Sequence, residues 1–242
     1  MAVARGSVVD EVADRIAFQI AAGMVEPGER LPSIRLLAAE HGINPSTVQL
    51  VLGRLRACGF VETRQGLGVV VRDIQVYGGI ETWQYMFRFS RRLPDLTVRI
   101  LRDVLDTLRL FYEDALKKVA ADPRAYDLAP VRRALQRLEL MTDDEVAAGD
   151  VHKCVMQILR SGRAMVGGGL TLGILNSLGD VLGEVPEVLQ ALYAEPREHV
   201  WWWRLILTAW EDADEEAGLR ALDLLEPWHA EVERRLRALL AG

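Results

Sequence analysis

The chain has 242 residues, of which 50% are hydrophobic and 26% charged, an ordinary mixture that can bury one large core or two modest ones. No apolar run approaches the roughly 18 residues that a membrane-spanning helix needs, and the first residues lack the long apolar core of a signal peptide. The two cysteines, Cys58 and Cys154, lie far apart, which argues against a disulfide framework or a cysteine zinc site. We therefore expect a soluble cytoplasmic protein with no membrane partner.

The charge distribution is more informative than the net charge of −6, which by itself disfavours nucleic acid as a partner. Residues 30–72 contain six arginines and only two acids, Glu40 and Glu62, so this segment carries +4. Residues 1–75 are neutral as a whole, and the rest of the chain carries the negative charge. A locally basic module beside an acidic one is typical of a nucleic-acid-binding domain joined to another domain.

Three helices are predicted within the first sixty residues. Residues 8–22 show the four-residue apolar spacing of an amphipathic helix. Ser33 is a suitable N-cap for a second helix, which Gly42 ends after about two turns. A third helix begins with Asn44 as its N-cap and Pro45 at its first helical position.

Two short β-like runs follow the third helix and surround the glycine-rich segment 64–68, which indicates a hairpin. Helix, helix, short turn, helix and hairpin together predict a winged helix-turn-helix. From about residue 77 onward the β signals disappear, and the apolar spacing predicts helices only. They are expected at about 95–121, 127–141, 143–161, 164–183, 186–193, 196–211 and 214–240.

The start of the third helix is the predicted DNA-contacting surface, because such helices meet base edges with their N-terminal turns. Asparagine and glutamine suit adenine, serine and threonine reach phosphate or base, and arginine reaches guanine or phosphate. The alternative is that these are solvated polar side chains on a three-helix bundle, which the +4 segment disfavours. The predicted contacts are Arg35, Asn44, Ser46, Thr47, Gln49, Arg54, Arg64, Gln65 and Gly66.

Residues 8–72 resemble the GntR family of bacterial transcription regulators, through segments 26–33, 36–38, 42–48, 59–61 and 66–71. The resemblance implies a homodimer that binds a palindromic double-stranded DNA operator, with the wing tip near the minor groove. Many relatives have arginine where this chain has Pro45 and Gln49, so the operator need not match the commonest consensus.

The all-helical remainder resembles the effector domain of the FadR subgroup, through segments 150–154 and 161–162 and the last two helices. Many such domains hold a divalent metal through one aspartate and three histidines. Asp150 fits the aspartate, but the histidine positions fall on Cys154, Trp203 and Leu225. We therefore predict no metal and no cofactor. If a metal is bound, a shifted register makes its ligands Asp150, Cys154, His199 and His229.

A cluster of tryptophans in the segment 201–210 has two interpretations: ordinary core packing, or the wall of a pocket for an apolar ligand. We take the second as the working hypothesis, with fatty acyl-CoA as the ligand class, since the founding FadR-type regulator also lacks the metal histidines and responds to acyl-CoA. The predicted pocket residues are Asp150, Cys154, Gly168, Trp203 and Leu225.

The resulting prediction is a mainly α, two-domain, ligand-responsive transcription factor. Its winged helix-turn-helix domain is expected at 1–73, a linker at 74–79, and the helical effector-binding and dimerisation domain at 80–242. Its effector is expected to be an apolar carboxylate or acyl-CoA. The alternatives are a metal-dependent member of the same family that senses a small hydroxy or sugar acid, a constitutive DNA-binding protein without an effector, and an α-helical enzyme. Common catalytic motifs such as GxSxG, HExxH and the P-loop are missing from the sequence, so we expect no catalysis.

Overall fold

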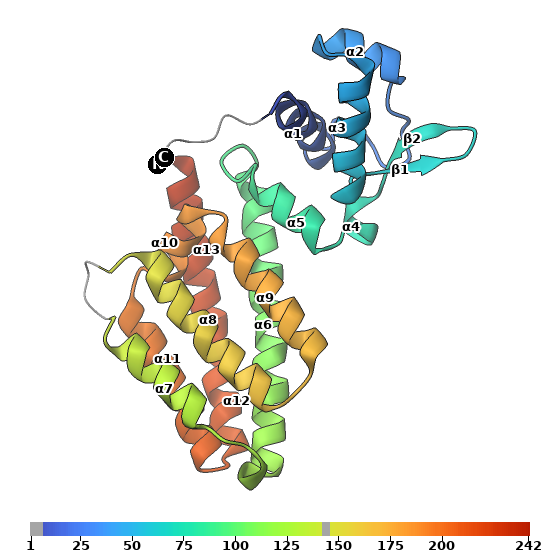
Figure 1. The fold of residues 1–242 in the computed structure, drawn as a ribbon. Coiled ribbons are helices and arrows are strands. Elements are labelled where there is room, and N and C mark those ends of the chain that lie inside the picture. The colour runs from blue at the N-terminus through green and yellow to red at the C-terminus, as the bar shows by residue number, and fades with distance from the viewer. Residues whose placement is uncertain (1–6, 142–145) are drawn as a thin grey trace. The chain divides into compact units, whose positions relative to one another are not determined.

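A computed structural model describes residues 7–141 and 146–242 of the chain (Figure 1). Contacts between residues divide it into two compact units, one that ends at Phe89 and one over Ser90–Gly242. The fold class predicted from the sequence is confirmed: a winged helix-turn-helix precedes a unit whose described residues form helices and loops without a strand. No helix within the described ranges combines the length and the apolar character needed to cross a membrane.

The first unit is a helix-turn-helix with a wing. Figure 1 shows α2 packed across the N-terminal end of α3, with the two-stranded hairpin projecting beside α3. The elements are α1 (Val8–Ala21), α2 (Ile34–His41), α3 (Pro45–Ala57), β1 (Val61–Arg64), β2 (Gly68–Val71), α4 (Ile74–Tyr77) and α5 (Ile80–Phe87).

Side-chain caps fix where α2 and α3 begin. Ser33 accepts a hydrogen bond from the Leu36 N–H at the start of α2, and Asn44 does the same for Thr47 at the start of α3. Between them Gly42 has φ 62°, a left-handed conformation that favours glycine and turns the chain sharply. The structure therefore confirms the predicted N-caps, Ser33 and Asn44, and the predicted turn at Gly42. The apolar sides of the three helices enclose a core that includes Ile16, Leu37, Val48, Leu52, Leu55 and Phe60.

The wing is an antiparallel hairpin anchored at its base and exposed at its tip. Val61 pairs with Val71 at the buried end, and Arg64 pairs with Gly68 at the exposed end. Gly66 at the tip has φ 77°, which explains the requirement for glycine there. The tip therefore extends from the core as a narrow polar loop.

The boundary between the two units lies later in the chain than the predicted domain boundary. The predicted linker 74–79 contains α4, and the predicted second domain begins on α5, which packs against α1 of the first unit. The hydroxyl of Thr82 on α5 donates to the carbonyl of Cys58 at the end of α3, at 2.8 Å. Because α5 buries Tyr85, Met86 and Phe87 within the first unit, the compact unit extends to Phe89.

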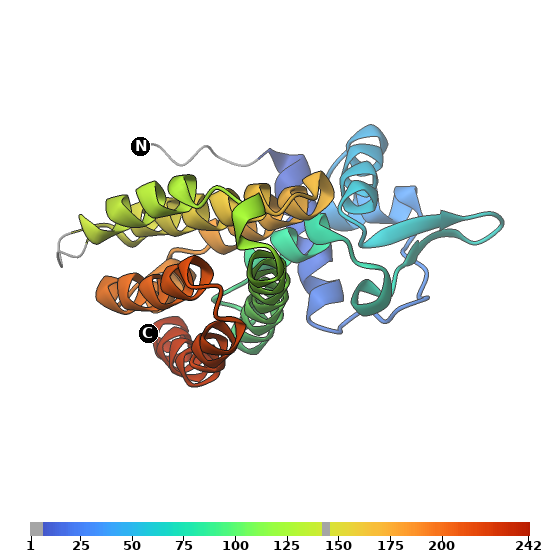
Figure 2. The ribbon, with the colours of Figure 1, turned by 90° about the horizontal axis from the view of Figure 1, so that it is seen from below.

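The second unit is a helical bundle around the long helix α6, which contacts α8 and α9 as well as α11, α12 and α13. Figure 2 looks nearly along the axis of α6, with the other helices of the bundle beside it. The elements are α6 (Pro94–Ala121), the 3-10 turn η1 (Pro123–Ala125), α7 (Ala129–Glu139), α8 (Ala148–Met165), α9 (Gly169–Gly183), α10 (Pro186–Leu192), α11 (Pro196–Glu211), α12 (Glu215–Asp223) and α13 (Leu225–Ala241).

Three of the predicted helices in this unit, those at 143–161, 164–183 and 214–240, differ from the structure. The helix predicted at 143–161 is described from Ala148 to Met165, and its predicted first residues, 143–145, lie outside the described residues. The helix predicted at 214–240 is divided near Leu224 into α12 and α13. α9 begins only at Gly169, because Gly167 and Gly168 adopt positive φ angles that end the preceding helix.

Candidate nucleic-acid interface and ligand cavity

The first turn of α3 is held by one asparagine oxygen. Oδ1 of Asn44 accepts from the Thr47 N–H at 2.8 Å, from Ser46 Oγ at 2.6 Å and from Thr47 Oγ1 at 2.8 Å. Both hydroxyls donate inward, so each presents lone pairs outward, and its outward partner must be a donor such as a base amino group. The Asn44 side-chain amide nitrogen keeps its donors for a second partner.

The outward face of α3 continues through Ser46, Gln49, Leu50 and Gly53, which share the solvent side of the helix. Leu50 is 63% exposed, and a Cβ built on Gly53 meets nothing within 4 Å, so the helix backbone is open to close approach there. An exposed leucine beside an amide side chain suits a thymine methyl beside an adenine. Leu50 is not among the contacts predicted from the sequence, because those on this helix were chosen for polar side chains alone.

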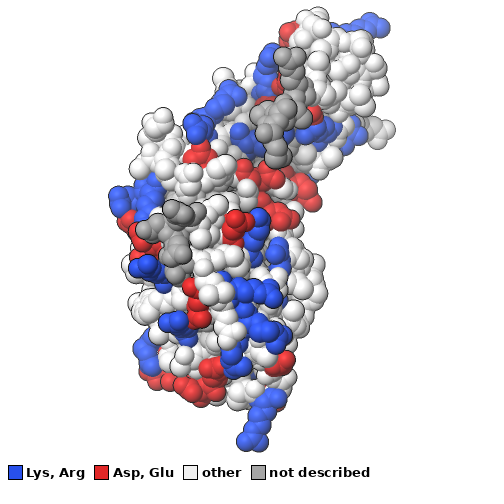
Figure 3. Space-filling view, turned by 60° about the vertical axis from the view of Figure 1, so that its left-hand side comes forward, with Lys and Arg blue, Asp and Glu red and all other residues white. Residues whose placement is uncertain are grey.

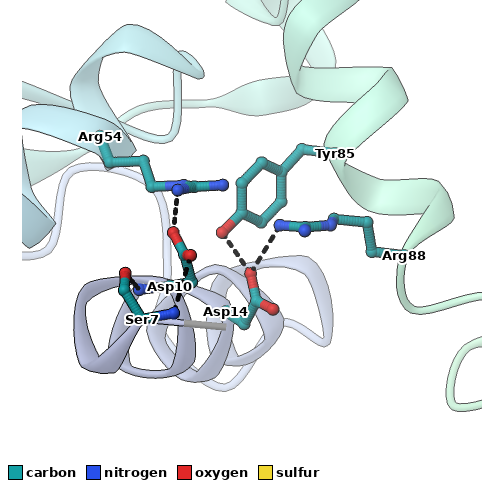
Figure 4. Close-up of polar contacts among 6 residues, drawn as sticks. All are labelled: Ser7, Asp10, Asp14, Arg54, Tyr85 and Arg88. Atoms are coloured by element: carbon teal, nitrogen blue, oxygen red, sulfur yellow. Dashed lines mark hydrogen bonds and ion pairs between the residues drawn. The ribbon is translucent and has the colours of Figure 1, made fainter. Parts of the chain in front are cut away.

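Arg54 does not lie on this outward face, which corrects one predicted DNA contact. It projects from the side of α3 that faces α1, where its guanidinium pairs with Asp10 and lies over the Tyr85 ring at 5.9 Å from the centroid (Figure 4). Asp14, one turn after Asp10 on α1, accepts from the Tyr85 hydroxyl and pairs with Arg88 at 3.0 Å. Arg54 therefore joins a polar cluster that links α1, α3 and α5.

The remaining predicted contacts lie on exposed parts of α2 and the wing. Arg35 is exposed and has no ion-pair partner among the described residues. Arg64 donates to Glu62 at 2.6 Å but stays 54% exposed, and Gln65 and Gly66 form the exposed tip. The start of α3, Arg35 and the wing tip are thus all available to a partner.

The second unit shows a different charge pattern. On the face drawn in Figure 3, acidic and basic side chains are interspersed over this unit rather than gathered into one basic field. Several of its arginines pair with acids from other helices, as Arg204 does with Glu139 and Arg91 with Glu187. Nonspecific attraction to a phosphate backbone needs cationic side chains that are not paired with acids. We therefore expect this face to attract DNA only weakly.

The second unit contains a cavity of about 460 Å³, a size typical of small-molecule sites. Aliphatic side chains from α6, α8 and α9 form much of its wall. The aromatic part of the wall comes from α6, the end of α10, α11 and α13. Its six aromatic residues are Tyr112, Tyr193, Trp201, Trp202, Trp203 and Trp228.

The aromatic wall is packed edge to face. The Tyr112 ring lies 5.1 Å from that of Trp202 and 5.6 Å from that of Trp203, at steep interplanar angles. The Trp202 indole N–H donates to the Ala221 carbonyl at 2.8 Å, which fixes the ring. Trp201 is 54% exposed, so one aromatic side chain of the cavity also reaches the surface. Rings held this way form a shaped wall rather than a collapsible one.

Two histidines at or next to the cavity are held in their neutral form. The Nε2 of His199 lies 2.9 Å from the Leu192 carbonyl, so this nitrogen carries the proton. Burial lowers the pKa of His199 to about 4. His152 lies behind Tyr193. Its Nε2 is 3.0 Å from the Gly179 carbonyl oxygen, and its Nδ1 is 2.9 Å from the Tyr193 hydroxyl oxygen. Burial lowers the pKa of His152 as well. Neither ring supplies a positive charge near neutral pH.

The structure brings together only part of the predicted pocket and metal set. Trp203 and Leu225 line the cavity, and so do His199 and His229. Three other predicted residues lie outside its wall: Asp150, exposed and paired with Lys153 at 2.7 Å, Cys154, half-buried on α8, and Gly168, in the turn before α9.

The predicted alternative metal site does not fit this arrangement, because its aspartate and its cysteine do not border the cavity that holds its two histidines. Among the described residues, no group of three or more His, Cys, Asp or Glu side chains is placed to hold a metal ion. A stable divalent site needs about that many converging ligands.

Comparison with known proteins identifies the first unit. Residues 8–71 match the profile of the bacterial regulatory proteins of the gntR family. The HTH-type transcriptional regulator Mce2R of Mycobacterium tuberculosis (strain CDC 1551 / Oshkosh) is 34% identical over 142 residues, which are 58% of this chain and 53% of Mce2R. MngR of Escherichia coli (strain K12), the repressor of a mannosyl-D-glycerate transport and metabolism system, is 38% identical over 95 residues, 39% of this chain and 38% of MngR.

A solved structure of Lar, which controls the expression of the Listeria monocytogenes agr system, aligns with a TM-score of 0.55 at 16% identity. That alignment covers 98% of this chain and 100% of the other. At this identity the likeness supports the fold alone. The chain spans about half the length of Mce2R and of a second curated relative, the HTH-type transcriptional regulator Mb0601 of Mycobacterium bovis. Residues 8–71 are thus a winged helix-turn-helix domain of the gntR family, and the named relatives are regulators rather than enzymes.

Proposed function

We propose that this chain is a ligand-responsive transcriptional regulator that binds a palindromic operator as a homodimer. The observation that carries the proposal is the exposed, asparagine-capped first turn of α3, placed in a gntR-type domain beside an exposed wing tip. Helices of this kind insert their first turns into the major groove. The finer assignment of the second unit as a FadR-type effector domain is part of the proposal, and its support is a helical bundle that encloses a cavity.

The DNA-reading roles follow from the chemistry of each side chain. Gln49 suits adenine through a bidentate amide contact, and Leu50 suits the methyl group of a neighbouring thymine. Ser46 and Thr47 accept from base amino groups while their own protons stay on Asn44. Arg35 and the wing tip approach the phosphate backbone. A dimer places two copies of α3 about 34–36 Å apart, one turn of the duplex.

The cavity is proposed as the effector site. A ligand that binds more tightly to one packing of the helices than to another shifts the populations of the two packings. If the favoured packing spaces the two winged units wrongly for the operator, DNA and ligand weaken each other's binding by the same factor. The described wall contains no Lys or Arg to pair with a carboxylate or a phosphate. We therefore retain the apolar body that the sequence led us to expect of the effector, and we do not retain its carboxylate or acyl-CoA headgroup.

A selection from randomised duplexes, followed by mobility-shift titration of the winning sequence, tests the DNA-binding proposal. We expect a palindrome whose half-sites contain A·T pairs and whose centres are about one helical turn apart. Arg35→Ala should weaken binding about tenfold or more, as loss of one base or phosphate contact does. Arg133→Ala, which removes an exposed arginine from α7 in the second unit, is the matched control and should change nothing. Failure to enrich any duplex would refute the proposal.

A further inference from the structure

We infer that the cavity of the second unit binds a lipophilic cation: an ammonium or phosphonium group carried on an apolar or aromatic body. This inference rests on the proposed function, because it names the effector class of the same cavity. Its support is the charge and the aromatic content of the wall.

The charged side chains that line the cavity are all acidic. They are Glu198 on α11 and Glu231 on α13, and no Lys or Arg is among the described lining residues. Glu231 is already neutralised by Arg234 at 2.6 Å and Arg235 at 2.8 Å, and these bonds lower its pKa to about 2. Glu198 has no ion-pair partner among the described residues. One carboxylate of the wall therefore keeps an uncompensated negative charge.

The other titratable groups that face the cavity do not offset this charge. His199 on α11 and His229 on α13 both have pKa values lowered by burial, so both are neutral near pH 7. Tyr112 on α6 and Tyr193 after α10 have pKa values raised by burial, so their hydroxyls stay protonated. Among the described residues that line the cavity, Glu198 is therefore the carboxylate without a paired cation, and a cationic ligand complements it.

The aromatic side chains place further negative potential along the wall. The faces of tryptophan and tyrosine rings attract cations, and tryptophan attracts them most strongly. Trp201 and Trp202 follow Glu198 by three and four residues on α11, so these side chains lie along one side of the helix. Trp201 and Glu198 are both exposed, which puts carboxylate and ring together where the cavity reaches solvent.

An apolar body and a cationic head match the two parts of this site. The aliphatic wall from α6 and α8 suits the body, because removing apolar surface from water is favourable. A carboxylate or phosphate head would instead meet Glu198 without a compensating cation, which costs affinity through like-charge repulsion. The geometry thus favours a cation over both an anion and a purely polar ligand.

The test compares two ions of nearly the same shape and opposite charge. Tetraphenylphosphonium and tetraphenylborate are titrated separately into the full chain, with heat and tryptophan fluorescence as readouts. Five of the six tryptophans belong to the second unit, and four of them line the cavity, so fluorescence reports on the site. We expect the phosphonium to bind at least about tenfold more tightly, a modest value for cation–π contacts plus one ion pair.

Glu198→Gln tests whether the preference comes from this carboxylate. The substitution should weaken phosphonium binding about three- to fivefold, the size of one partly exposed ion pair, and leave borate binding unchanged or stronger. The control is Glu215→Gln, which removes one negative charge from an exposed position on α12 outside the cavity wall and should leave both affinities as they were.

The outcomes separate this inference from the proposed function. Equal or tighter binding of the borate, or an unchanged preference in Glu198→Gln, overturns the cation inference while the cavity stays an effector site. Binding of neither ion overturns the inference outright. Both titrations use the protein without DNA, so their result does not depend on whether the DNA-binding proposal is correct.

Discussion

His199 gives the second unit a pH-dependent stability that can be calculated from its surroundings. Its ring is enclosed between Tyr193, at 4.8 Å between centroids, and Trp228, at 5.0 Å. Burial outweighs the favourable bond to the Leu192 carbonyl and lowers the pKa from 6.5 to about 4. The folded chain therefore keeps this ring neutral at pH values where the unfolded chain protonates it.

The sign follows from proton binding. Between about pH 6.5 and pH 4 the unfolded state binds more protons at this position than the folded state does, so the free energy of unfolding falls as the pH falls through that window. The full shift corresponds to about 3 kcal/mol. Because the ring stays partly exposed, we expect about 2 kcal/mol to be lost between pH 7.5 and pH 4.5 through His199.

Urea unfolding at a series of pH values, followed by tryptophan fluorescence, measures this loss. The comparison is with His199→Gln, whose amide N–H can still donate to the Leu192 carbonyl but does not titrate. The variant should lose about 2 kcal/mol less than the unchanged chain over the same pH interval. An NMR titration of the histidine ring carbons gives the pKa directly. A folded-state pKa near 6.5, or parallel stability curves for the two proteins, would refute the reasoning.

Three further predictions concern packing and polar contacts. Asn44→Ala should lower the stability of the first unit by about 1 kcal/mol through loss of the helix cap, whereas Asn44→Asp should keep that stability and weaken DNA binding by repelling phosphates. Chemical unfolding and mobility shifts measure both, and a neutral Asn44→Ala would contradict the capping role. Gly218→Ala on α12 should cost about 1–3 kcal/mol, because the added methyl collides with the Leu116 side chain on α6. Gly173→Ala on α9, where the methyl meets nothing within 4 Å, is its control in thermal unfolding. Tyr85→Phe and Asp14→Ala should each destabilise the first unit by about 0.5–1.5 kcal/mol. Their double-mutant cycle should show coupling, and strictly additive losses would mean that the hydrogen bond contributes nothing.

Local chemistry explains why so much of the first unit could be predicted. Ser33, Gly42, Asn44 and Pro45 act on residues within four positions of themselves, so their pattern in the sequence determines where α2 ends and α3 begins. The same holds for the glycine at the wing tip. What could not be predicted depends on distant residues. Arg54 is redirected by Asp10, 44 positions earlier, and no local pattern indicates that pair.

The second unit shows the same contrast more strongly. Its helices follow from apolar spacing, with errors where one helix gives way to the next, as at Gly167–Gly168 and at Leu224. The cavity, however, is assembled from helices far apart in the chain, from Leu105 on α6 to Glu231 on α13. Two of its residues have no sequence signature: Glu198, whose carboxylate has no ion-pair partner among the described residues, and Tyr112. A glutamate in a first helical turn and an aromatic residue in a helix stripe are both ordinary.

This contrast bears on how ligand specificity and DNA binding are separated in the chain. The proposed DNA-contacting surface is concentrated in the first turn of α3. Because Asn44 positions both Ser46 and Thr47, a substitution there disturbs several contacts at once. A cavity built from many helices can change its charge through one wall residue without altering the packing of the others. Glu198, exposed and without an ion-pair partner among the described residues, is such a position. Exchanging it should therefore alter which ligand is bound while leaving the fold and the DNA-reading turn unchanged.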